Sequence, residues 1–285
     1  MFEPLEMDHS YVDIEKAKQD NMIKGSRNYF GFYVHQKMPY PGDMTSDWMT
    51  LSSAYIISSA NDMGKYLQWY ISDSHPEILS KENRQRMFSE TVNAADNYKY
   101  GFGWGVVSSE GRELYLHGGN VENYTTYMII VPEKKIGIIA LTNSCDFFVA
   151  DGYTVSIPMN TAYEIINWDT NDISENDYMY KHLMYDLIKL ILTAACSLPV
   201  WRYKKWRNKN NNKILSGIFI AVIHIIVPTL LLTVFSITMD RPLFVVRRFA
   251  PDVFITQCIC TVCLYGTGLL KIINLIKKNK ELKAK

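Results

Sequence analysis

Basic residues are scarce in the first 180 positions, where 13 Lys and Arg stand against 25 Asp and Glu. A nucleic-acid-binding domain needs a basic patch on its folded surface, so this shortage argues against nucleic acid as a partner. Acidic residues are scarce in the remaining positions, where 4 accompany 17 Lys and Arg. The formal net charge of +1 therefore averages two oppositely charged parts, which we expect to lie in different surroundings.

Cysteine is also scarce. Only Cys145 lies in the acidic part, so that part cannot form an internal disulfide. The other four, Cys196, Cys258, Cys260 and Cys263, lie in apolar runs and have no histidine at zinc-site spacing. We expect them to be small apolar residues of helices, and we expect neither a metal nor a cofactor.

Long apolar runs occur only in the basic part. The chain of 285 residues is 48% apolar, which excludes disorder and leaves room for one large domain or two small ones. Three runs approach the roughly 20 residues that a membrane-spanning helix needs, namely 183–201, 214–237 and 254–276. The first is the weakest, because it contains Asp186 and Lys189, which lie one turn apart and could pair.

Basic residues flank these runs and predict an orientation. They concentrate in the loop 202–213 and in the tail 277–285, which the positive-inside rule places in the cytoplasm. Three spans then place residues 1–182 on the outer side of a lipid bilayer. The first ten residues have no basic stretch, apolar core or cleavage site of a signal peptide. We therefore expect the chain to be the C-terminal part of a longer protein.

The acidic part has mixed helix and strand patterns. Ser59-Ala-Asn-Asp62 is a capping-box pattern that opens an apolar-periodic helix through Tyr70. Pro132-Glu-Lys-Lys135 joins two β-branched runs and predicts a hairpin. The expected helices are 59–70, 81–88 and 158–166, the expected strands are 100–107, 113–117, 124–131 and 136–141, and 167–182 is expected to be an acidic linker.

Five runs together carry a resemblance to a known family. They are Phe2–Met7, Leu51–Met63, Tyr100-Gly-Phe-Gly-Trp104, His117-Gly-Gly119 and Pro132–Asn143. In this order and spacing they resemble the C-terminal half of the serine β-lactamase-related domain, shared by class C β-lactamases, penicillin-binding-protein-like proteins and esterases. Glu6 departs from the glycine that is usual there. The resemblance implies an α+β fold for residues 1–166, a partial β-lactamase/transpeptidase-like domain with an antiparallel sheet and flanking helices, followed by an all-α transmembrane region.

The resemblance also implies a mechanism whose first two motifs are missing from this sequence. The family uses a nucleophilic serine in S-x-x-K, a proton shuttle in Y/S-x-N, and a strand with K-T-G or H-x-G. No serine here has lysine three residues on, and no tyrosine has asparagine two residues on. Ser59-Ala-Asn61 fits S-x-N formally, but a helix cap is the better interpretation. We expect no acyl-enzyme chemistry from these 285 residues.

The third motif supplies the candidate site. His117 stands where the family has the lysine of K-T-G, so a cation or donor there could hold an anionic or carbonyl group. Gly118 and Gly119 would let a substrate lie against the strand, and the resemblance makes the amide of Asn120 one of two oxyanion donors. The alternative is a histidine at a strand end followed by a tight Gly-Gly turn. Three further residues could line the cleft or simply be turn and pairing residues: Asn123, Tyr124 and Asn143.

The resemblance implies acyl transfer or hydrolysis on a peptide, amide or ester, with cell-wall peptide or a β-lactam-like small molecule as partner, at a bacterial membrane. The alternative is a non-catalytic, membrane-tethered binding or sensor module on the same scaffold. Two subsidiary expectations follow. The apolar faces of 124–131 and 136–141 should be partly uncovered without an N-terminal half, and His224 with Pro228 could mark a functional kink.

Overall fold

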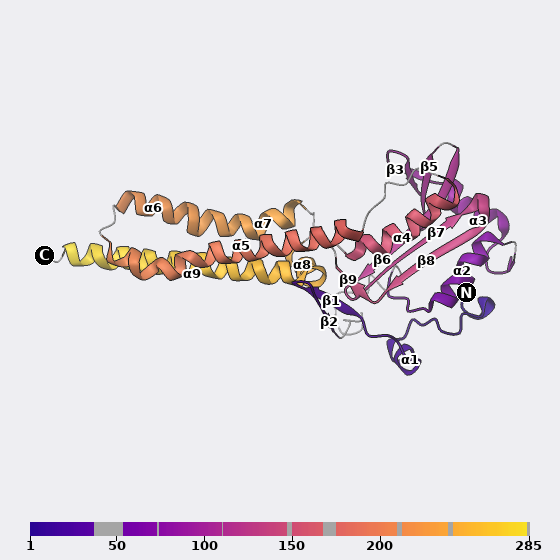
Figure 1. Ribbon diagram of the computed structural model, residues 1–285, viewed down its shortest axis with the longest axis horizontal. Helices are drawn as coiled ribbons and strands as arrows, with labels where there is room; N and C mark the ends of the chain where they lie inside the picture. The colour runs from indigo at the N-terminus through magenta and orange to yellow at the C-terminus, as the bar shows by residue number, and fades with distance from the viewer. Residues whose placement is uncertain are drawn as a thin grey trace. The chain divides into compact units, whose positions relative to one another are not determined.

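A computed structural model describes residues 1–36, 54–72, 74–109, 111–146, 150–167, 175–209, 213–238 and 242–283 (Figure 1). The chain forms two compact units, one of residues 1–27 and 33–178 and one of residues 28–32 and 179–285. Each unit is described by itself below.

The first unit is built on a six-stranded antiparallel sheet in which neighbours in sequence are neighbours in space. Its strands, in sheet order, are β3 (Val92–Ala95), β4 (Tyr98–Tyr100), β5 (Gly105–Ser109), β6 (Arg112–Val121), β7 (Tyr124–Val131) and β8 (Ile136–Thr142). The turn predicted at Pro132–Lys135 is the short helix η3 (Pro132–Lys134), followed by Lys135 in the left-handed conformation. The predicted hairpin of β7 and β8 is therefore confirmed.

Two helices cover the two faces of this sheet. Helix α4 (Ala150–Ile165) packs on β7 and β8, and α2 (Ala60–Ile71) packs on β8 from the other side. Because strand side chains alternate between faces, β6 and β7 contribute side chains to two apolar clusters, one on each face of the sheet. The first contains Leu114, Leu116, Ile129, Val131, Ala162 and Ile166, and the second contains Leu67, Trp104 and Ile130.

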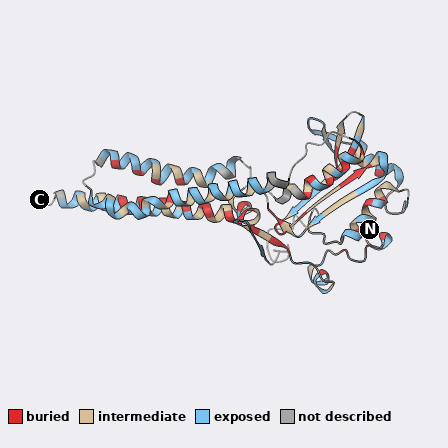
Figure 2. Ribbon diagram, viewed as in Figure 1, coloured by how far each residue is buried: buried red, intermediate tan, exposed pale blue. Residues whose placement is uncertain are grey.

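The expectation of partly uncovered strand faces is wrong for the end of β7, which these helices cover, and is confirmed for β8. The C-terminal residues of β7, Ile129 to Val131, are fully buried (Figure 2). Only β8, which ends the sheet, is partly open, with Ile136 38% and Leu141 39% exposed. The covering comes from α2 and from the later turns of α4, whose Ala162 is in the apolar cluster with Ile129 and Val131.

Helix α2 begins as the sequence predicts, but its capping box is only half formed. Ser59 Oγ accepts a 3.1 Å hydrogen bond from Asp62 N. The Asp62 carboxylate does not bond back to the cap; its Oδ2 accepts from His9 N and from Ser10 Oγ, each at 2.8 Å. Asp62 therefore ties the N-terminal segment to the helix.

Smaller elements surround this core. They are η1 (Glu3–Leu5), α1 (Ile14–Gln19), α3 (Lys81–Ser89) and a second sheet of β2 (Phe32–His35), β1 (Ser26–Tyr29) and β9 (Ser144–Cys145), in which β1 and β9 run parallel. The sequence predicts α3 but none of the others. The expected strand 100–107 is interrupted between β4 and β5 by a turn in which Gly103 has a φ of +80°. Pro158 lies inside α4 rather than at its start.

The second unit is helical. Its helices are α5 (Glu175–Asn208), α6 (Lys213–Ala221), the π-helical turn η4 (Val222–Ile226), α7 (Val227–Thr238), α8 (Leu243–Phe249) and α9 (Pro251–Lys283). Three segments, 179–208, 214–234 and 251–281, are long and apolar enough to cross a membrane. They contain the first and third predicted spans, and the second segment ends three residues before the predicted span 214–237 does. Helix α5 also takes up residues 175–182 of the expected linker.

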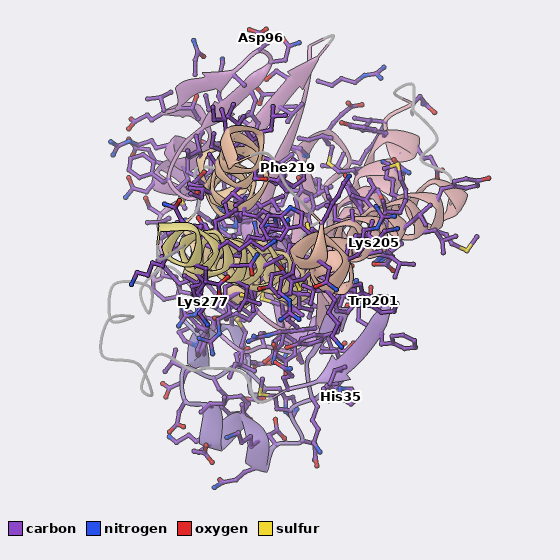
Figure 3. All side chains as sticks on the ribbon, turned by 90° about the vertical axis from the view of Figure 1, so that its left-hand side faces the viewer. His35, Asp96, Trp201, Lys205, Phe219 and Lys277 are labelled. Atoms are coloured by element: carbon purple, nitrogen blue, oxygen red, sulfur yellow. The ribbon has the colours of Figure 1, made fainter. Side chains whose placement is uncertain are left out.

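Charged residues within this unit pair as the sequence suggests. Lys189 Nζ lies 2.7 Å from Asp186 Oδ1, one turn earlier on α5. It also contacts the carboxylate of Asp252 on α9, which the sequence did not predict. Basic residues lie near the C-terminal ends of α5 and α9. They include Lys205 on α5 and Lys277 on α9, both labelled in Figure 3.

Candidate functional site

Within the described part of the chain, the second half of β6 pairs with a strand on one side only. Strand β5 pairs with β6 up to the Gly105–Leu116 pair, whereas β7 continues alongside as far as Val121. Among the described residues, no strand pairs with 117–121 on the β5 side. Because strand N–H and C=O groups point alternately to the two sides, part of this backbone faces the open edge.

The turn between β4 and β5 ends the pairing at this point. Gly101 N donates a 2.9 Å hydrogen bond to Trp104 O, which closes the turn beside Leu116. Trp104 is buried against Phe88, with ring centroids 5.5 Å apart, and so anchors the turn in the core. The open edge of β6 therefore begins next to the anchored turn between β4 and β5, where the pairing of β5 with β6 ends.

His117 is the first residue of the open edge. Strand alternation puts it on the same face as Tyr115, and its ring centroid lies 6.4 Å from that of Tyr100. Burial lowers the pKa of His117 below its ordinary value of 6.5, which favours the neutral imidazole. The two roles suggested for this position, a cation or a hydrogen-bond donor, stay predictions.

The two glycines that follow are strand residues, which overturns the alternative of a tight Gly-Gly turn. A Cβ on Gly118 would lie 2.8 Å from the ring of Tyr127 on β7, and one on Gly119 would lie 3.0 Å from Thr126 Oγ1. Gly118, Gly119 and Asn120 are all exposed. The two glycines let side chains of β7 lie against β6. The role of the Asn120 amide as an oxyanion donor stays a prediction.

The three cleft candidates gather around the segment Ile23–Arg27 instead of a cleft. Asn123 is fully buried; its Oδ1 accepts from Arg27 Nε at 2.7 Å and its Nδ2 donates to Gln36 O at 2.9 Å. Tyr124 Oη donates to Ile23 O at 2.5 Å, and Asn143 Nδ2 donates to Lys24 O at 3.2 Å. Their side chains hold chain segments in place, which matches the alternative of pairing residues.

Sequence reasoning missed Gly25, on which this packing depends. A Cβ there would lie 2.5 Å from Asn123 Cβ and 2.7 Å from the Tyr124 ring. Only a residue without a side chain lets the N-terminal segment pass so close to the β6–β7 turn. No local pattern around Gly25 signals this contact, because its partners lie about a hundred residues away.

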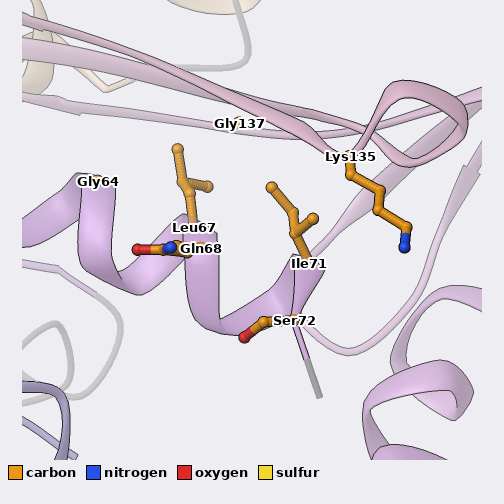
Figure 4. A pocket seen from close by; sticks show the side chains of 7 residues that line it. All are labelled: Gly64, Leu67, Gln68, Ile71, Ser72, Lys135 and Gly137. Carbon is orange, nitrogen blue, oxygen red and sulfur yellow. The ribbon is translucent and has the colours of Figure 1, made fainter. Parts of the chain in front are cut away.

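A groove of about 560 Å³ lies between α2 and the start of β8 (Figure 4). It is lined by Gly64, Leu67, Gln68, Ile71, Ser72, Lys135 and Gly137. Gly137 allows the close approach of helix and strand, because a Cβ there would lie 2.8 Å from Leu67 Cβ. None of the residues of the third motif lines this groove.

Several known proteins are similar to this chain in sequence. Protein flp of Staphylococcus aureus (strain MRSA252) is 20% identical over 217 residues, which cover 74% of this chain and 40% of that protein. A beta-lactamase of Yersinia enterocolitica is 21% identical over 203 residues, covering 58% of this chain and 47% of that protein. The chain thus spans less than half the length of these curated relatives.

Among solved structures, the octameric penicillin-binding protein homologue from Pyrococcus abyssi is similar, with a TM-score of 0.48 and 30% identity over 59% of this chain and 36% of that chain. The family model described as Beta-lactamase matches residues 1–152. That match covers more than half of the chain and includes the open strand of β6, so the chain belongs to the beta-lactamase family.

Proposed function

We propose that this chain is the C-terminal, membrane-anchored portion of an extracytoplasmic serine hydrolase related to β-lactamases and penicillin-binding proteins. The observation that carries the proposal is the open edge of β6 at 117–121, which coincides with the third motif of the family. The partners that fit such an edge are extended peptides, including cell-wall peptide, and small β-lactam-like molecules with an amide group.

In this proposal the strand binds and orients the substrate. An extended peptide adds to the open side of β6, and main-chain hydrogen bonds supply the affinity. The neutral imidazole of His117 donates a hydrogen bond to a carbonyl or carboxylate oxygen, and the amide of Asn120 faces the oxygen on which negative charge develops. These 285 residues contain no S-x-x-K motif, so in this proposal the chain by itself forms no acyl-enzyme.

The helical unit acts as the anchor. Its three apolar segments cross the bilayer, with the loop 202–213 and the tail 277–285 in the cytoplasm and the sheet unit outside. The basic loop and tail also suit a membrane surface that carries anionic lipids.

The alternative is a non-catalytic binding or sensor module tethered to the membrane. Two observations favour it together: the edge is open to a peptide strand, and the sequence has no S-x-x-K or Y-x-N motif. The DNA upstream of Met1 distinguishes the two, since an in-frame segment encoding S-x-x-K supports the hydrolase and a stop codon next to a ribosome site supports the binding module.

Fluorescent penicillin tests the catalytic half of the proposal on the full chain in detergent. We expect no label that survives denaturing electrophoresis, and a covalent label would overturn the claim of missing acyl-enzyme chemistry. Fluorescence polarisation with a labelled cell-wall peptide tests the binding half. His117→Ala should weaken that binding, whereas His75→Ala, an exposed histidine of the same unit paired with Glu77, should leave it unchanged.

A further inference from the structure

Two titratable side chains from different helices meet inside the second unit. His224 lies in η4 and Lys271 lies in α9, and the two residues are only 1% and 3% exposed. Lys271 Nζ lies 2.7 Å from His224 Nε2. Neither residue belongs to the family motifs or to the sheet unit. Ionisable residues buried among apolar helices are costly and usually serve a function.

Hydrogen bonding fixes where the protons of this pair lie. His224 Nδ1 is 2.8 Å from Leu264 O, and a carbonyl oxygen only accepts, so Nδ1 carries the proton. Nε2 is then the unprotonated nitrogen and accepts from Lys271 Nζ. A further proton could bind only at Nε2, where the lone pair is already used by Lys271.

The backbone on both sides is shaped to bring the pair together. Pro228 has no N–H to donate to the carbonyl four residues earlier, that of His224, and the turn Val222–Ile226 is π-helical. On α9 the facing residue is Gly268, where a Cβ would lie 2.5 Å from His224 Cβ. The kink predicted from His224 and Pro228 is thus a π-helical turn that faces a glycine.

Aromatic rings rather than carboxylates surround the ammonium group. Lys271 Nζ lies 5.0 Å from the ring centroid of Phe219 on α6, labelled in Figure 3, and 5.3 Å from that of Trp206 on α5. Such rings stabilise one positive charge. The salt bridges described in this unit are those of Lys189, so no described carboxylate offsets a second charge at the pair.

Other titratable groups near the pair are already engaged or lie further along the helices. Tyr203 Oη on α5 donates to Leu270 O at 3.2 Å, and Tyr265 Oη on α9 is 2.7 Å from Thr229 Oγ1 on α7. After its first residue α6 has no titratable side chain, and neither has α7. The next charged residue of α9 is Lys277, six positions beyond Lys271.

We propose that His224 and Lys271 form a proton-binding site that locks α9 against the π-helical turn. The locked pair carries one positive charge. A proton from solvent binds the Nε2 lone pair, Lys271 keeps its own protons but loses its acceptor, and the charge of the pair rises by one. Two like charges cannot remain at hydrogen-bond distance, so the contact breaks and the helices part locally.

Hydrogen exchange of the segment 264–271 tests the lock, using the full chain in detergent at about pH 8 and about pH 5.5, the range in which histidine titrates. After correction for the intrinsic pH dependence of exchange, wild-type opening should rise at least about tenfold on acidification, because close like charges repel strongly even in a polar medium. His224→Gln keeps an acceptor oxygen but cannot titrate, so its opening should change less than about twofold. The matched control His9→Gln, in the sheet unit, should behave as wild type.

The proposal is overturned if wild-type exchange in this segment does not respond to pH, or if His224→Gln responds as strongly as wild type. Nitrogen-15 spectra of histidine-labelled wild type provide a second measurement that needs no variant to fold. At about pH 8 the His224 ring should carry its proton on Nδ1. A proton on Nε2 would contradict the site.

Discussion

Among the polar residues of the sheet unit, Asp62 is expected to lower the free energy of unfolding most when it is substituted. It is 1% exposed, and its Oδ2 accepts hydrogen bonds from His9 N and Ser10 Oγ. Asp62→Ala removes the acceptor of both hydrogen bonds at once. Ser10 Oγ retains Ser58 Oγ at 2.7 Å as a partner, whereas no other acceptor is described for His9 N.

The expected loss in the free energy of unfolding follows from these contacts. A hydrogen bond to a charged group contributes about 1.5–3 kcal/mol, and a buried donor left without a partner costs about 1–3 kcal/mol. Because Ser10 can rely on its second partner, we expect a loss of about 3 kcal/mol for Asp62→Ala. Asp62→Asn keeps one oxygen and should lose about 1 kcal/mol.

Urea unfolding of the full chain in mild detergent, followed by tryptophan fluorescence, measures this loss. With a slope of about 1–3 kcal/mol per molar urea, the midpoint should fall by roughly 1–3 M for Asp62→Ala. Asp8→Ala is the matched control, since Asp8 lies in the same segment but is exposed. If Asp62→Ala and Asp8→Ala unfold at the same urea concentration, the tie between the N-terminal segment and α2 does not stabilise the fold.

Three further outcomes are expected. Ser59→Ala removes the cap of α2 and should lower stability by about 1 kcal/mol in the same titration; an unchanged midpoint would argue against the cap. The hydrogen bond to Asp20 raises the pKa of His9, so their ion pair forms below this raised pKa and is lost as the pH rises through it; Asp20→Asn should move the NMR titration of His9 to lower pH. Gly118→Val forces a side chain into the ring of Tyr127 and should reduce both peptide binding and thermal stability, and a variant with native melting and binding would refute the close packing.

Strands with continuous apolar, β-branched runs were the most predictable part of the fold. The runs 124–131 and 136–141 correspond to β7 and β8 almost residue for residue. The pairing of β1 with β9 could not be predicted, since its Ser26–Ser144 register joins two short polar segments that are far apart in sequence. Such strands carry no periodicity of their own.

The motif led to His117, which the structure places on β6 at the start of the open edge, and its role in a site stays a prediction. Residue type alone was a poorer guide. Asn123, Tyr124 and Asn143 were chosen because polar residues at strand ends often line clefts. Polar side chains at strand ends can also form hydrogen bonds with the backbone of a neighbouring segment. Here these three side chains donate to backbone carbonyls of the N-terminal segment around Gly25. Sequence alone cannot separate these two uses, because the deciding contact is made by a distant part of the chain.

The open strand of β6 is held by elements that this chain itself contains. Residues 117–121 pair with β7, the ring of Tyr127 packs against Gly118, and β7 is fixed in turn by β8 and by α4. None of these contacts involves a nucleophile-bearing segment. In the proposed function, binding and bond cleavage are therefore separable: the strand is positioned to receive a peptide whether or not a serine stands opposite it. Peptide binding without covalent labelling is the combination that this arrangement favours, and both the hydrolase portion and the binding module would use the same edge to achieve it.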